Sequence, residues 1–154
     1  NFNTATGSAS LAGANTGNYN VANGAYTLYN NTTGYNNTAI GSSALFTNTT
    51  GFNNTANGYR ALYLNTTGTD NAGFGIHSLY SNTTGINNTA TGSYSLQTNT
   101  TGSYNTANGV RALYLNSTGG FNTARIPTMP TITMAPRVAR RSSNSVAFGC
   151  RNRR

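Results

Sequence analysis

Residues 31–47 read N-T-T-G-Y-N-N-T-A-I-G-S-S-A-L-F-T, and the same frame returns at 17-residue steps along most of the chain. The tetrapeptide N-T-T-G begins at Asn31, Asn48, Asn65, Asn82 and Asn99, and N-S-T-G follows at Asn116. Self-similarity at one fixed period of this length is typical of a solenoid, in which each repeat is one small unit that stacks on its neighbours.

Three residue types recur at fixed places in this frame. An asparagine column lies two residues before an almost constant alanine, and a glycine column and a leucine column follow it. Their members are Asn3, Asn20, Asn37, Asn54, Asn71, Asn88, Asn105 and Asn122; Gly7, Gly24, Gly41, Gly58, Gly75, Gly92 and Gly109; Leu11, Leu28, Leu45, Leu62, Leu79, Leu96 and Leu113. Because side chains at one repeat position stack on each other, we expect these columns to be the structural ladders of the fold.

The glycine spacing predicts short strands rather than helices. A glycine returns every seven or ten residues, and each one costs a helix interior about 1 kcal/mol relative to alanine. We therefore predict an all-β parallel solenoid over residues 1–124, with two short strands and two turns in each 17-residue coil. The glycines would supply turn positions with positive φ, and alanine and leucine would point inward together. Asparagines of successive coils, about 4.8 Å apart, would bond to one another.

The period fails in the middle of a unit, at Arg125. Seven of the nine arginines lie from Arg125 to Arg154, and all three prolines lie there too. This composition predicts an irregular or disordered basic tail over residues 125–154. The formal net charge of +8 therefore belongs to the tail, and we expect no nucleic-acid binding by the repeat region.

The chain carries few groups that could perform chemistry. Only 6% of its residues are charged, with Asp70 as the single acid, His77 as the single histidine and Cys150 as the single cysteine. General acid–base or nucleophilic catalysis needs several such groups converging in a pocket, and a structural zinc site needs a Cys/His cluster. We expect no enzymatic activity, no cofactor and no metal site. No apolar run is long enough to cross a bilayer.

An aromatic residue follows the leucine in most repeats. On a strand it would face away from the inward leucine and form an exposed apolar stripe. We interpret this stripe as a subunit interface or a receptor contact, with a simple surface ladder of rings as the alternative. Its members are Tyr29, Phe46, Tyr63, Tyr80 and Tyr114.

The strings N-T-A-I-G at residues 37–41, N-T-A-T-G at 88–92 and N-S-V-A-F-G at 144–149 resemble the YadA-like head repeats of trimeric autotransporter adhesins. Similar N-T-A-x-G-x-x-A-L strings occur in bacteriophage tail-fibre and related surface proteins. The resemblance implies a left-handed parallel β-roll with three chains side by side, in a fibre at a cell or virion surface. The implied partners are copies of the chain and a host receptor, matrix component or glycan.

Two threonine columns leave a second function open, which is binding to ice or another regular surface through stacked hydroxyls. Adjacent residues of a strand point to opposite faces, so one threonine per coil would face outward unless a turn reorients the second. The asparagine before each pair also matches the N-glycosylation sequon. The columns are Thr32, Thr49, Thr66, Thr83 and Thr100, and Thr33, Thr50, Thr67, Thr84 and Thr101.

Overall fold

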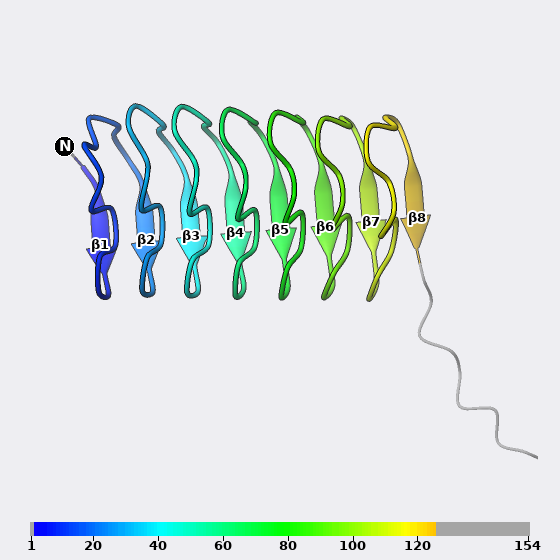
Figure 1. Cartoon of the computed structure of the whole chain (residues 1–154), viewed down its shortest axis with the longest axis horizontal. Coiled ribbons are helices and arrows are strands. Elements are labelled where there is room, and N and C mark those ends of the chain that lie inside the picture. Colours follow the sequence, from blue (N-terminus) through cyan, green and yellow to red (C-terminus); the bar gives the residue numbers. More distant parts are fainter. Residues whose placement is uncertain (1, 126–154) are drawn as a thin grey trace, which may run out of the picture.

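The computed structural model describes residues 2–125, which form a rod of stacked coils (Figure 1). Eight strands lie side by side in one parallel sheet, in the order of the sequence. They are β1 (Thr4–Thr6), β2 (Val21–Asn23), β3 (Thr38–Ile40), β4 (Thr55–Asn57), β5 (Ala72–Phe74), β6 (Thr89–Thr91), β7 (Thr106–Asn108) and β8 (Thr123–Arg125). The predicted parallel β-solenoid is confirmed. Of the tail predicted over residues 125–154, Arg125 is the last residue of β8, and residues 126–154 lie outside the described residues.

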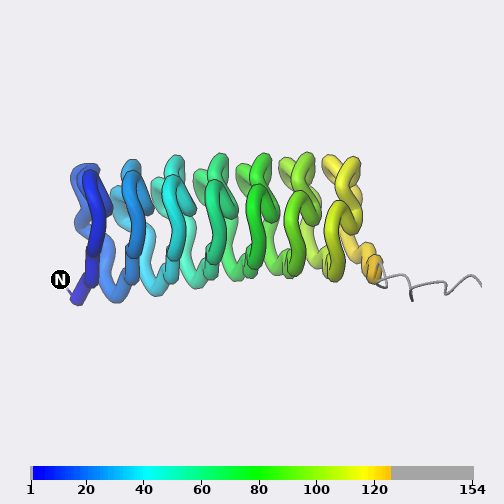
Figure 2. The backbone as a smooth tube through the Cα atoms, turned by 90° about the horizontal axis from the view of Figure 1, so that it is seen from below, coloured from blue at the N-terminus to red at the C-terminus, as the bar shows by residue number. Residues whose placement is uncertain are grey.

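Successive coils are joined in register by backbone hydrogen bonds. Ala39 of β3 pairs with Ala22 of β2 and Ala56 of β4, which are the equivalent residues of the coils on either side. At the two ends of β3, the Thr38 amide donates to the next coil and the Gly41 amide to the preceding coil, each at 2.8 Å. Each coil is therefore tied to both neighbours, and the backbone trace follows this stacking along the whole rod (Figure 2).

Each coil contains one strand, and the prediction of two was wrong. The segment around the core leucine is a turn in which Ser43 and Leu45 have φ of 57° and 50°, in the left-handed region. Consecutive Ala44 and Leu45 are both fully buried, which alternation along a strand would prevent. The turn is still bonded between coils, because the Leu45 amide donates to the Ala61 carbonyl at 3.0 Å.

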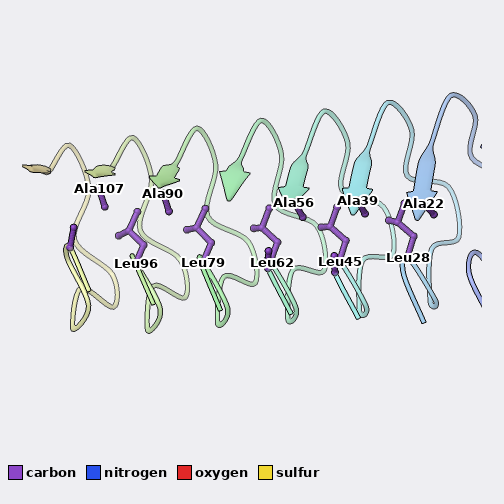
Figure 3. Packing of buried hydrophobic residues seen from close by; sticks show 13 residues of the cluster. Ala22, Leu28, Ala39, Leu45, Ala56, Leu62, Leu79, Ala90, Leu96 and Ala107 are labelled. Atoms are coloured by element: carbon purple, nitrogen blue, oxygen red, sulfur yellow. The ribbon is translucent and has the colours of Figure 1, made fainter. Parts of the chain in front are cut away.

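The apolar core is a thin layer between this turn and the sheet. The leucine column is fully buried from Leu28 to Leu96, and Ala39, Ala56 and Ala90 of the strands are equally inaccessible. The leucines extend from the turn toward the strand alanines (Figure 3). A single leucine and one or two alanines per coil bury little area, so each coil depends on its neighbours for a continuous core.

An asparagine ladder runs through the interior beside β1–β8. Asn54 is fully buried, and its Nδ2 donates to Asn37 Oδ1 at 3.2 Å and to the Gly68 carbonyl at 2.9 Å. Its Oδ1 accepts the backbone and side-chain N–H groups of Asn71, at 3.1 and 3.2 Å. The amide therefore replaces the hydrogen bonds to water that burial removes.

A second ladder consists of the first asparagine of each N-T-T-G. Asn48 Nδ2 donates to Asn31 Oδ1 at 2.8 Å and to the Gly51 carbonyl at 3.0 Å, and Asn65 repeats the pattern. These asparagines are fully buried as well. The repeat is thus rich in asparagine because each of the two buried amide positions in a coil hydrogen-bonds to the equivalent amide of the neighbouring coil.

The two glycine columns have different causes. Gly58 has a φ of +142°, and a Cβ added there would lie 2.5 Å from the Gly75 carbonyl oxygen. The N-T-T-G glycines are not among the described residues with positive φ, so that part of the prediction was wrong. A Cβ at Gly51 would instead lie 2.5 Å from the Gly68 carbonyl oxygen. These glycines are required for close packing of the coils.

Gly73 should be replaceable by alanine, with a gain in stability. It stands at the strand position that holds alanine in every other coil, and an added Cβ would lie 3.0 Å from Ser78 Oγ. The same pair, Ala90 with Ser95, is already buried one coil further on. We expect Gly73→Ala to stabilise the rod by about 0.4–1 kcal/mol, since alanine restricts the unfolded chain.

The measurement is thermal unfolding followed by circular dichroism. Gly75→Ala is the matched control, because Gly75 has a φ of +131° and its added Cβ would lie 2.7 Å from the Gly92 carbonyl carbon. That variant should melt at a lower temperature than the parent. Equal losses in both variants would contradict the account given for Gly73.

Candidate functional site: the aromatic face

One side of the rod carries a ladder of stacked rings. Tyr29 and Phe46 lie 5.3 Å apart between ring centroids, Phe46 and Tyr63 5.2 Å, and Tyr63 and Tyr80 5.2 Å, with interplanar angles of 5°, 12° and 7°. Gln97 occupies the next place, so Tyr114 is separated from the stack. The rings are half-buried, not exposed as predicted, because each ring covers the next. Offset stacking contributes about 0.5–1.5 kcal/mol per pair beyond burial.

A second column lies beside this ladder, two residues before each core leucine. The Arg60 guanidinium lies 5.1 Å from the Tyr59 ring centroid and 5.2 Å from that of Tyr63. Arg111 lies 5.9 Å from the centroids of Tyr94 and Tyr114. We call the two columns together the aromatic face; the members used below are Tyr29, Phe46, Tyr63, Tyr80, Gln97 and Tyr114, with Arg60, His77, Tyr94 and Arg111.

His77 lies in the middle of the aromatic face. Its ring centroid lies 4.9 Å from that of Tyr80 and 5.4 Å from that of Tyr94. Burial lowers the pKa of His77, and the positive charge of Arg60 lowers it further. The imidazole is therefore neutral at pH 7, with one nitrogen as donor and the other as acceptor.

Unpartnered polar atoms gather on this face. Among residues 2–125, the buried side-chain nitrogen and oxygen atoms without a hydrogen-bond partner are Arg60 Nε, His77 Nε2 and Gln97 Oε1. All three belong to the aromatic face. Buried polar groups are nearly always paired in folded proteins. These three atoms have almost no solvent-accessible surface, so a partner could pair with them only after their side chains moved.

The two titratable groups considered for catalysis have separate surroundings. Asp70 is exposed and accepts a hydrogen bond from Asn53 Nδ2 at 3.0 Å, whereas His77 packs among tyrosines. In the part of the chain that the structure describes, no three His, Cys, Asp or Glu side chains are grouped to hold a metal ion. Nor do these residues contain a helix long and apolar enough to span a membrane. Cys150 lies outside them.

The two threonine columns differ in accessibility. The Thr32 hydroxyl donates to the Thr49 carbonyl of the next coil at 2.9 Å, and Thr49 repeats this to Thr66 at 3.0 Å. The column of Thr33 and Thr50 is exposed. Only one threonine column is therefore fully presented to solvent. The sequon asparagines Asn31, Asn48 and Asn82 are buried, so a glycan attached there would break the second ladder.

The sequence predicts the ladder of Tyr29, Phe46, Tyr63, Tyr80 and Tyr114, whereas the neighbouring column with Arg60, His77 and Arg111 was not predicted. The signal was present, since these three residues share one position of the 17-residue frame. Comparisons with protein-family models, curated proteins and solved structures found no match for this chain.

Proposed function

We propose that this chain is a non-enzymatic structural or adhesive segment of an extracellular or virion-surface fibre, which uses the aromatic face to associate with copies of itself. The observation that carries the proposal is the ladder of stacked rings along one side of the rod, flanked by arginines that lie over tyrosine rings. Stacked coils hold these groups at a fixed spacing, so that many weak contacts add up along the rod.

The chemistry of the aromatic face suits self-association. Tyrosine and arginine are the residue types enriched at the centres of protein interfaces. The rings are already ordered by stacking, and little side-chain entropy is lost when a partner covers them. Following the resemblance of the repeat, we propose a trimer.

The test is the mass of the full chain in solution, measured by light scattering on a size-exclusion column. We expect about three times the chain mass of 16.1 kDa. Gln97→Arg, which adds a third cation between Arg60 and Arg111, should convert the trimer to a monomer. Thr101→Arg adds the same charge at an exposed place of the same coil and should leave the trimer intact. A monomeric parent chain at all concentrations would refute self-association.

Binding to ice or another regular surface is the second candidate, and the exposed column of Thr33 and its equivalents favours it. The hydroxyls of the other threonine column donate hydrogen bonds within the rod. This candidate therefore depends on a single column of exposed threonines. A monomeric chain that slows ice-crystal growth would move this function ahead of the fibre.

A further inference from the structure

A pocket of about 370 Å³ opens at the first two turns of the rod, and its lining includes none of the residues of the aromatic face. It is lined by Tyr19 and Tyr35, Asn18 and Asn36, Thr16 and Thr33, and Gly17. This volume lies near the lower end of the range for small-molecule sites. Its lining contains no charged side chain.

The repeat departs from its consensus at the pocket. Asn15 acts as the first asparagine of the turn, because its Oδ1 accepts a hydrogen bond from Asn31 Nδ2 at 2.9 Å across 16 residues. Only Thr16 separates Asn15 from Gly17, whereas two threonines follow Asn31. The segment from Leu11 to Asn15 is one residue longer than its equivalent in the next coil, so the coil keeps its 17 residues and its register. The pocket is lined in part by this shortened turn.

The exposed aromatic residue moves to a neighbouring position of the repeat at the same place. Phe2 and Tyr19 form one stack, with centroids 5.3 Å apart and an angle of 9°, and Tyr35 and Phe52 form another, at 4.8 Å and 4°. Tyr19 shares its repeat position with Asn36, while Tyr35 lies one position earlier in the frame. Tyr19 is 60% exposed and Tyr35 41%. The pocket thus lies between two stacks that leave both phenol rings accessible.

We propose that this pocket binds a pyranose ring of a neutral glycan. The C–H face of a sugar ring packs on an aromatic face, and its hydroxyls pair with amides and hydroxyls placed around that ring. Asn18 and Thr33 make no side-chain hydrogen bond among residues 2–125 and are free to do so. An acidic sugar would require a cation, and Arg60 and Arg111 both belong to the aromatic face.

The proposal goes beyond self-association and does not depend on it. A single shallow pocket should bind one sugar ring with a dissociation constant on the order of 1 mM, and several pockets in an oligomer would raise the avidity. A chain that proves monomeric but binds the glycan would refute the trimer and leave this site standing.

The experiment is saturation-transfer NMR on the full chain with four probes, the methyl glycosides of glucose, galactose, mannose and N-acetylglucosamine. Sialyllactose serves as the acidic comparison. We expect transfer to the ring protons of at least one neutral glycoside, and its loss in Tyr35→Ala. Tyr104→Ala is the control, because Tyr104 is 47% exposed and stacks on Phe121 at 4.8 Å in a distant coil; its signal should equal that of the parent.

A second variant separates binding from folding. Tyr19→Asn places at this position the residue type found at Asn36, Asn53 and Asn87, which have φ of 54–56°. Asparagine tolerates this left-handed conformation, so the rod should melt at or above the parent temperature while the transfer disappears. Absence of transfer to all four glycosides, transfer to sialyllactose alone, or full transfer in the Tyr19→Asn variant would each overturn the proposal.

Discussion

Asn54→Ala is expected to destabilise the rod by about 3–6 kcal/mol, a large part of the stability of a typical domain. The substitution removes the acceptor of two N–H groups of Asn71 and one of the two donors to the Gly68 carbonyl, which keeps its bond from Asn65 Nδ2. Each buried group left unpaired costs about 1–3 kcal/mol. This loss of stability is confined to the coils beside Asn54, because each coil contacts only its neighbours. Urea unfolding followed by circular dichroism measures it.

Asn57→Ala is the matched control in the same coil. Asn57 ends β4 and its side chain is exposed, so its removal should change the unfolding free energy by less than about 0.5 kcal/mol. If Asn54→Ala were as mild as Asn57→Ala, the amide ladder would contribute nothing to stability, and the rod would have to rest on its apolar core alone.

Replacing Leu62 and Leu79 together with aspartate is expected to abolish the cooperative fold of the rod. Both side chains are fully buried in adjacent coils. Each substitution forfeits about 2–3 kcal/mol of apolar burial and places a carboxyl group in a layer with no cation to pair it. The circular dichroism spectrum and the melting transition should both be lost.

Leu115→Asp is the control for charge alone, because Leu115 is 79% exposed. Its spectrum and melting temperature should match those of the parent chain. An unchanged melting curve for the Leu62 and Leu79 double variant would show that the leucine column is not the core, and would refute the packing described above.

The fold could be predicted because every coil repeats the same solution. A 17-residue period that preserves asparagine, glycine and leucine allows few structures other than stacked coils. The turn could not be predicted in the same way. Leucine has no local preference for a φ near 50°, and it adopts that value at Leu45 because the side chain then enters the core beside Ala44. Tertiary packing overrides the alternation that a strand would impose.

The candidate sites could be predicted only in part. The ring ladder follows from its spacing, but the burial of its rings depends on the conformation of the turn. The pocket depends on the shortened turn between Asn15 and Gly17 and on the change of column between Tyr19 and Tyr35. In a repeat protein, the departures from the consensus hold the information about binding that the consensus itself cannot carry.

The two asparagine ladders also give the rod a direction. In both, Oδ1 accepts from the coil that follows in sequence, and Nδ2 donates to the Oδ1 of the coil that precedes it. The amide dipoles therefore add along the axis, and any length of this rod has a donor end and an acceptor end. Two such rods can extend each other only by joining unlike ends, so a filament grown from them would be polar, with one end chemically different from the other.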